Sequence, residues 1–394
     1  MSTLKVGAIR GVSASSDAIT VANDGTASAN LTSVGGAPLS SRNKVINGAM
    51  LVSQRNTTFS CNTSEIYTID RFKTEMGSSF DFDTTITQEN DTPDGFQKSL
   101  KVTPDSTKSV SASDNAGIYT LLEGEDLQDF KSGTSGAKKI VYSFFAKSGS
   151  SNNGHQYSVF LRLRNGSNFY KQTRSFTVTS SWQRFSFAFD LDTSTNQIGT
   201  AATDACFFGC WLVCGPDDLV AESTSWATGT TFIGANGQSN FMDNTNNEFF
   251  ITGVQLEISD SGVATEFEHK SFTEELLRCQ RYFCKSYNYN VYDTSTDSGD
   301  HFDGAVCQRS LSSTGGNLIF SPYPVLMRVE PTVTMRGPTA ATDAAGKIRG
   351  SGGAVIDVGG FQNTNSPRQL AFFFTSNQSN SFISGHYYAD AELA

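Results

Sequence analysis

Apolar and polar residues alternate with a period of two along much of the chain between residues 42 and 270. The clearest runs are KIVYSFFAK (139–147), QYSVFLRLR (156–164), SWQRFSFAFDL (181–191) and NEFFITGVQLEI (247–258). This alternation is typical of antiparallel strands that bury one face, and the linkers between the runs are rich in turn-forming residues. The pattern predicts an all-β, jelly-roll-like antiparallel sandwich over residues 42–270.

The same pattern assigns side chains to faces. In the last run, we expect Phe250, Val254 and Leu256 to share the buried face. Two tryptophans, Trp182 and Trp211, accompany apolar strand patterns and are expected in the core.

Three cysteines, Cys206, Cys210 and Cys214, fall at even offsets along one apolar run. On a strand, neighbouring members would stand ~13 Å apart, which is too far for a shared tetrahedral metal site. They are therefore expected to be buried free thiols that pack as small apolar groups.

The segment SFTEELLRCQRYF, which starts at residue 271, has a different pattern. Ser271 and Glu274 match the S-x-x-E capping box that begins helices, and apolar residues follow at near-helical spacing. We predict a linker helix over 271–285, followed by a smaller distal β-domain over 286–394. Residues 1–41 are polar and too short to bury a core, so we expect a docking partner or an oligomer to order them.

Composition narrows the functional classes. The net charge is −10 and no basic run is longer than a pair, which argues against nucleic-acid binding. The densest apolar stretch, residues 206–215, is far shorter than the ~20 residues of a membrane-spanning helix. The N-terminal residues also lack a signal-peptide pattern, so we expect neither membrane insertion nor signal-dependent export.

Two segments resemble signatures found in tail-fibre proteins of tailed bacteriophages. NKVINGAMLVSQRNTTF, followed by YTIDRF, is similar to N-x-I-N-G-x-M…Q-R…Y-T-x-D-R-F, and VQLEISDSGVATEFEHKSFTEELLRCQRYF is similar to V-Q-L-E…A-T-x-F-E…E-L-x-x-C-Q-R-Y. Because the charged and polar motif positions lie at module junctions, we expect structural hydrogen bonds and ion pairs there. These positions are Asn47, Gln54, Arg55, Asp70, Arg71, Gln255, Glu257, Glu268, Cys279, Gln280 and Arg281.

The resemblance implies a virion fibre that is commonly a homotrimer and that is assembled in the host cytoplasm. Residues 1–41 would be its virion anchor and would dock to a phage tail adaptor or nozzle protein. The distal end would contact a host-surface glycan or another receptor, and shallow sites repeated in each copy would gain strength through avidity. No cofactor is implied.

Sugar binding needs aromatic side chains that stack on the ring and polar groups that bind its hydroxyls. The candidates are Trp226, in a polar stretch, and Tyr287, Tyr289, Tyr292, Tyr387 and Tyr388 in the distal domain. If the distal tyrosines lie on strands, Tyr287 and Tyr289 share a face, which is equally compatible with packing. Tyr387 and Tyr388 would then point to opposite faces.

Catalytic patterns are weak. The sequence contains no G-x-S-x-G motif, and Asp300, His301 and Asp303 form an isolated turn-like cluster for which we predict no metal. We therefore predict an adhesin without catalytic residues. A purely structural fibre or decoration protein, a polysaccharide depolymerase and a secreted monomeric carbohydrate-binding module remain as alternatives.

Overall fold

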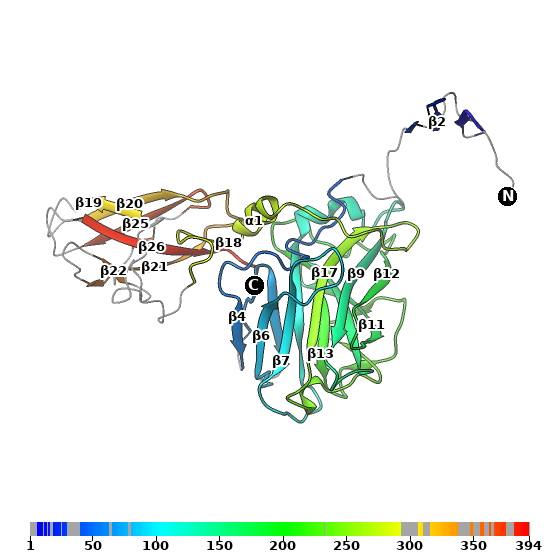
Figure 1. Ribbon diagram of the computed structural model, residues 1–394, viewed down its shortest axis with the longest axis horizontal. Helices are drawn as coiled ribbons and strands as arrows, with labels where there is room; N and C mark the ends of the chain where they lie inside the picture. The colour runs from blue at the N-terminus through cyan, green and yellow to red at the C-terminus, as the bar shows by residue number, and fades with distance from the viewer. Residues whose placement is uncertain are drawn as a thin grey trace.

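The computed structural model describes residues 6–10, 12–13, 15, 19–24, 26–29, 40–62, 65–77, 80–231, 233–292, 306–309, 316–337, 347–349, 355–357, 362–363, 366–375 and 382–393. Over these residues the chain is nearly all β, and the predicted fold class is confirmed: a jelly-roll-like antiparallel sandwich is followed by a smaller β-module (Figure 1).

The sandwich consists of two six-stranded antiparallel sheets. The first has the order β15 (Ala227–Thr228), β11 (Asn168–Thr177), β10 (Gln156–Asn165), β13 (Asp204–Cys214), β8 (Asn115–Glu123) and β5 (Phe72–Gly77). The second has the order β12 (Gln183–Asp190), β9 (Lys139–Ser148), β17 (Phe249–Ile258), β7 (Ser99–Pro104), β6 (Thr84–Glu89) and β4 (Thr58–Cys61). Smaller elements are the parallel pair β14 (Leu219–Val220) and β16 (Gly234–Ala235) and the 3₁₀ helices η1 (Gly124–Phe130) and η2 (Phe241–Asp243).

The core of the sandwich forms where the inner faces of the two sheets meet, as the alternating pattern predicts. Tyr157, Val159 and Leu161 on β10 pack there with Tyr142 and Phe144 on β9. Each of these side chains is at most 1% exposed. Burial of apolar surface contributes ~25 cal/mol per Å², so this closely packed face stabilises the sandwich.

The face assignment of β17 is wrong at one position. Gly253 adopts a positive φ of 62°, and the pairing with β9 shifts register between Thr252 and Gln255. This bulge inverts the alternation, so Phe249 lies in the core before it and Val254 after it. Phe250 therefore lies on the outer face.

The prediction that Trp182 lies in the core is also wrong, because Trp182 packs beside Phe250. Its ring centre is 6.2 Å from that of Trp182, whose indole nitrogen donates to Asp91 on the surface at 3.0 Å. Trp182 is thus half-buried outside the core. Trp211 is completely buried, as expected, and Cys206, Cys210 and Cys214 are buried free thiols.

Helix α1 (Phe272–Gln280) begins where the capping box predicts but ends earlier. The Ser271 hydroxyl accepts a hydrogen bond from the Glu274 backbone N–H at 3.2 Å. The predicted linker helix over 271–285 is too long, because β18 (Phe283–Lys285) pairs with the last strand of the C-terminal module.

The C-terminal module is built around β26 (Phe382–Asp390), which pairs with four other strands. These are β18, β19 (Val306–Arg309), β21 (Thr332–Arg336) and β22 (Lys347–Arg349), and β22 also pairs with β23 (Val355–Asp357). A second sheet contains β20 (Gly316–Pro322), β25 (Gln369–Thr375) and β24 (Gln362–Asn363). Residues 286–292, which look strand-like in sequence, instead form bends and a turn.

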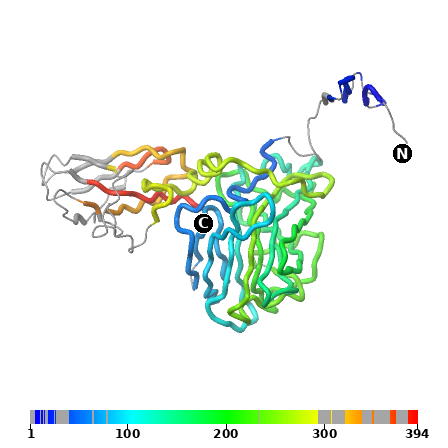
Figure 2. The backbone as a smooth tube through the Cα atoms, viewed as in Figure 1, coloured from blue at the N-terminus to red at the C-terminus, as the bar shows by residue number. Residues whose placement is uncertain are grey.

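Near the N-terminus, β1 (Ala8–Ile9), β2 (Ile19–Val21) and β3 (Ala27–Ala29) form a small antiparallel sheet. It stands apart from the sandwich, whereas the C-terminus returns to the junction between the two modules (Figure 2). The residues after β26 therefore lie at the junction of the two modules, where the site described next is found.

Candidate functional site at the module junction

The first tail-fibre-like motif, which contains Asn47, Gly48 and Met50, forms a tight loop with an unusual backbone conformation. Asn47 and Met50 have positive φ values of 62° and 58°, and asparagine tolerates this region better than most residues. A Cβ atom on Gly48 would lie 2.1 Å from the carbonyl oxygen of Val254. Only glycine therefore lets this loop approach β17, the strand that carries the start of the second motif.

Hydrogen bonds from Asn47 fix that loop. Its side-chain amide donates to the carbonyl oxygens of Val52 and Asp70 at 2.8 Å, and its side-chain oxygen accepts from the Val52 N–H at 2.8 Å. Its backbone N–H donates to the carboxylate of Glu275 on α1. The asparagine thus connects the loop to the helix.

A buried network of hydrogen bonds joins the two parts of the second motif, which are β17 and the residues ahead of α1. The Glu257 carboxylate accepts from the Gln255 amide at 2.9 Å and from the Thr265 N–H at 2.8 Å. The Glu268 N–H donates to Gln255, and the Glu268 carboxylate accepts from the Asn43 N–H at 2.8 Å. These contacts connect the chain ahead of α1 both to β17 and to the first motif.

A buried group of charges lies where the two modules meet. The Arg71 guanidinium lies 3.5 Å from the centre of the Tyr282 ring, donates to the Leu121 carbonyl at 2.7 Å and pairs with Glu392. Burial lowers the pKa of Arg71, but the Glu392 carboxylate, together with Tyr282, Tyr67 and Cys279, outweighs burial and holds that pKa above its ordinary value. Arg71 therefore stays charged at 1% exposure.

Arg55 and Asp70 continue this group. Arg55 lies 3.8 Å from the centre of the Phe283 ring and 3.3 Å from both Asp390 and Glu392. Asp70 is 4.0 Å from Arg55 and accepts from the Gln54 N–H at 2.6 Å and from the Gln54 amide at 2.7 Å. Burial raises the pKa of Asp70, and Arg55 opposes that rise. The amide of Gln54 also donates to the carbonyl of Phe283 in β18 at 2.7 Å, which ties the modules together.

The remaining motif residues lie along α1 and its end. Cys279 is fully buried, and burial raises the pKa of its thiol. Gln280 is the half-buried last residue of the helix, and Arg281 pairs with Glu123 at 3.1 Å and Glu125 at 2.9 Å. The two motifs, far apart in sequence, thus contribute to one buried junction.

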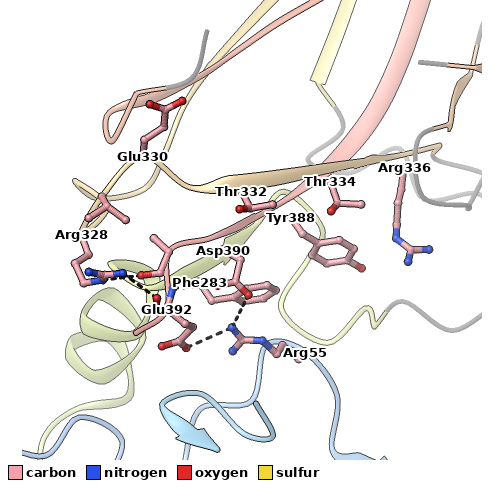
Figure 3. A pocket seen from close by; sticks show the side chains of 12 residues that line it. Arg55, Phe283, Arg328, Glu330, Thr332, Thr334, Arg336, Tyr388, Asp390 and Glu392 are labelled. Carbon is pink, nitrogen blue, oxygen red and sulfur yellow. Dashed lines mark hydrogen bonds and ion pairs between the residues drawn. The ribbon is translucent and has the colours of Figure 1, made fainter. Parts of the chain in front are cut away.

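An open cleft of about 590 Å³ lies beside this charge group, between Arg55 of the sandwich and a sheet face of the C-terminal module (Figure 3). Its other lining side chains come from β18, β21, β26 and the segments next to them. They are Phe283, Arg328, Val329, Glu330, Thr332, Thr334, Arg336, Tyr388, Asp390, Ala391 and Glu392.

A ladder of rings supports the cleft. Phe283 stacks on Tyr388 at 5.9 Å between ring centres, Tyr388 on Tyr287 at 5.5 Å, and Tyr287 on the buried His386 at 3.8 Å. Tyr388 contacts a ring on each side and its hydroxyl oxygen is buried. The cleft therefore has no open aromatic face at this residue.

The candidate aromatic residues separate into one cleft residue and several packing residues. Of the six candidate aromatic residues, only Tyr388 lines the cleft. Trp226, the candidate from the polar stretch, is half-buried against the core and donates to the Asp190 carbonyl at 2.8 Å. Tyr287 and Tyr387 are buried at 6% and 3% exposure, so they do not form a stacking platform.

Tyr289 and Tyr292 have structural positions as well. The Tyr289 hydroxyl accepts from the Ser53 N–H at 2.7 Å and joins the two modules. Tyr292 is half-buried, and the centre of its ring lies 4.8 Å from the ammonium nitrogen of Lys285. Neither belongs to a strand, because residues 286–292 are irregular.

Sequence reasoning missed Thr332, Thr334 and Arg336, which line the cleft together. They occupy alternate positions of β21, and a run of polar residues at every second position was the available clue. Asp300, His301 and Asp303 lie outside the described residues. In the part of the chain that is described, no group of three His, Cys, Asp or Glu side chains could hold a metal ion, and no helix is long and apolar enough to cross a membrane.

No protein-family model and no curated protein matches this chain. Solved structures that match include the enzymatically active domain of bacteriophage CBA120 tailspike protein 4, at 12% identity and a TM-score of 0.28. The match covers 55% of this chain and 21% of the tailspike, so this chain spans about a fifth of that structure.

Carbohydrate-binding modules match as well. The CBM22-1 xylan-binding domain from Paenibacillus barcinonensis has 10% identity and a TM-score of 0.27, with 53% of this chain and 99% of that one covered. A family 11 module of a Clostridium thermocellum cellulase has 12% identity and a TM-score of 0.26, with 54% and 98% covered. At such TM-scores, these similarities carry no argument about a site or a ligand.

Proposed function

We propose that this chain is a subunit of a virion tail fibre of a tailed bacteriophage and attaches the virion to a host-surface glycan. The observation that carries the proposal is the junction cleft, whose hydroxyl and charged groups suit a polyhydroxylated ligand. The two tail-fibre-like motifs support it, because their residues build the junction on which the cleft depends.

The chemistry of the cleft matches sugar binding in size and polarity. Its 590 Å³ falls within the ~300–1,000 Å³ typical of small-molecule sites. Thr332 and Thr334 offer hydroxyl groups that both donate and accept, and Glu330 accepts. A sugar hydroxyl needs such mixed partners, since it is itself both donor and acceptor.

Binding without catalysis fits the carboxylates of the cleft. Two of its three carboxylates, Asp390 and Glu392, are engaged by Arg55 at 3.3 Å, which favours a structural role for them over proton transfer. We therefore propose an adhesin and not a depolymerase.

An open cleft binds weakly in one copy, so the proposal includes a homotrimer in which avidity strengthens attachment. Residues 1–41 are proposed to dock this assembly to a tail adaptor or nozzle protein, after assembly in the host cytoplasm. The β1–β3 sheet is consistent with this role, since strands so short need a partner for stability.

A glycan array tests the proposal. We expect the full chain to bind at least one glycan, and Thr334→Trp or Thr332→Trp, which fill the cleft, to weaken that binding at least about tenfold. Thr107→Trp, at an exposed position of the sandwich, is the matched control and should bind like the original. Either no glycan binding or undiminished binding by both cleft variants would refute the proposed site.

A further inference from the structure

The outer face of the second sheet of the sandwich carries aromatic and charged side chains in one row. Strand pairing places Lys147 on β9, Phe250 on β17, Lys101 on β7 and Thr87 on β6 next to one another (Figure 1). At ~4.8 Å between neighbouring strands, they span about 14 Å of the sheet. Trp182, just ahead of β12, extends this outer row, with its ring centre 6.2 Å from that of Phe250 and 5.7 Å from the ammonium nitrogen of Lys147.

The bulge at Gly253 places Phe250 in the outer row. Because the bulge inverts the faces of β17, this aromatic side chain points out of the core. The ammonium nitrogens of Lys147 and Lys101 lie 4.6 and 5.8 Å from the centre of its ring. Bulges that redirect a side chain in this way are frequent next to active sites. The outward Phe250 gives the outer row an apolar base beneath its long charged side chains.

Polar contacts hold the Trp182 ring in one orientation. Its indole nitrogen donates to one carboxylate oxygen of Asp91 at 3.0 Å, and the other oxygen pairs with Lys147. The Ser99 hydroxyl donates to the Asp91 carbonyl at 2.6 Å, which fixes the loop between β6 and β7. Trp182 is half-buried, so part of its ring stays accessible in a position that needs no further ordering when a ligand binds.

The loop between β6 and β7 also borders the outer row. Phe96 in this loop packs on Phe145 of β9, with the ring centres 5.3 Å apart. Gly253 allows this approach, because a Cβ atom there would lie 2.7 Å from the Phe96 ring. The Thr252 hydroxyl donates to the Lys98 carbonyl at 2.8 Å and holds the loop against β17. The outer row therefore lies beside a fixed edge.

Partly exposed carboxylates complete the polar groups around the outer row. Lys101 pairs with Glu89 at 3.1 Å and with Glu248 at 3.8 Å, and these two glutamate side chains are 34% and 38% exposed. The Asp91 side chain is 47% exposed. The carboxylates can accept from sugar hydroxyls and the ammonium groups can donate to them. Because both lysines of the row already pair with carboxylates, the site suits a neutral sugar better than an acidic one.

We infer that the outer row is a second glycan-binding site, which takes an extended, neutral saccharide. One sugar ring contacts the exposed part of Trp182, and the hydroxyl groups of the saccharide bind Asp91, Lys101 and the carboxylates next to it. The inference rests on the proposed function for its class of ligand, but it uses no residue of the junction cleft. Two sites in each subunit increase the avidity of a multi-copy assembly.

Affinity electrophoresis of the full chain through gels that contain dextran, mannan, galactan or laminarin tests the site. We expect at least one of these neutral polymers to retard the protein and Trp182→Ala to weaken that binding at least about tenfold. Lys101→Met keeps the aliphatic stem over Phe250 and removes the ammonium donor, so it should weaken binding roughly three- to tenfold. Lys138→Met is the matched control and should bind like the original, because its side chain has a similar exposure, 25% against 23%, and pairs with Asp260 outside the outer row.

Tryptophan fluorescence locates the bound polymer. Of the three tryptophans, Trp211 is completely buried and Trp226 packs against the core, so a saccharide on the outer row should shield mainly Trp182 from quenching by acrylamide. This protection should persist in Thr334→Phe, which fills the junction cleft without adding a tryptophan, and should disappear in Trp182→Phe. A purely structural Trp182 predicts no protection. Circular dichroism confirms that each variant is folded.

The outcomes separate this inference from the proposed function. Undiminished binding by Trp182→Ala and Lys101→Met, or no protection of Trp182 by a bound polymer, overturns the inference and leaves the junction cleft in place. If Trp182→Ala does not fold, Lys101→Met and Trp182→Phe decide in its stead. The inference also fails if no neutral polymer retards the protein, although arrayed glycans bind. Absence of binding to every polymer and every arrayed glycan overturns both.

Discussion

At the scale of single residues, Glu75 on β5 shows how local burial changes chemistry. Burial raises the pKa of this carboxyl group to about 7, and the nearby Glu65 charge adds to the rise, while Tyr119 and Arg162 oppose it. Its ordinary value is 4.5. Between those two values, the folded protein binds more protons than the unfolded chain, so its stability falls as the pH rises.

We predict that Glu75→Gln stabilises the protein above pH 7 and has little effect near pH 4. The expected gain is roughly 1–3 kcal/mol, reduced from the full shift because the side chain is partly solvated. Denaturant unfolding at a series of pH values measures it. The exposed Glu266→Gln is the control, and a gain that is independent of pH would contradict the prediction.

Residues also show why the sequence predicted the buried positions better than the site. The alternation of Tyr157, Val159 and Leu161 depends on neighbours in the same strand, and the core confirms it. Whether Tyr388 or Tyr387 reaches a cleft depends on β18 and β21, which pair with β26 from distant parts of the chain. No local pattern encodes that arrangement.

At the scale of elements, the segment after β26 fastens the two modules together. The Ala391 N–H donates to the Tyr282 carbonyl at 2.7 Å, and the Tyr67 hydroxyl donates to the Leu393 carbonyl at 2.6 Å. Glu392 pairs with Arg55 and Arg71, with its side chain only 4% exposed. The terminal residues therefore act as a clamp across the junction.

We predict that Glu392→Gln destabilises the protein by about 3–5 kcal/mol, because it leaves buried cations without one of their carboxylates. Thermal unfolding and limited proteolysis near residues 281–292 measure the loss. Glu274→Gln, at a carboxylate of α1 that is 52% exposed, removes only a surface pair at 3.5 Å and serves as the control. Equal stability of the two variants would refute the clamp.

Elements also explain two errors of sequence interpretation. The bulge at Gly253 inverted the faces of β17, and a single glycine within an apolar run did not reveal it. The linker helix was predicted too long because the apolar residues Tyr282 and Phe283 continue its spacing. In the structure, Phe283 instead pairs with Asp390 in β26, a contact between residues more than 100 positions apart.

At the scale of the whole molecule, the chain combines a β-sandwich and a smaller β-module (Figure 1), with the cleft at the polar junction between them. The fold class followed from the pattern of strands. The cleft required the meeting of both modules, so its position could not be predicted. We propose that several copies of this arrangement act together as a fibre, since one open cleft alone would bind weakly.

The measurement that tests this claim most directly is the solution mass of the full chain, by light scattering after size exclusion. The account predicts a mass near three times 42.5 kDa. A chain that begins at Arg42 shows whether the β-modules alone hold the trimer, because it lacks the β1–β3 sheet. A monodisperse monomer of the full chain would contradict the fibre and favour a soluble, single-copy glycan-binding protein.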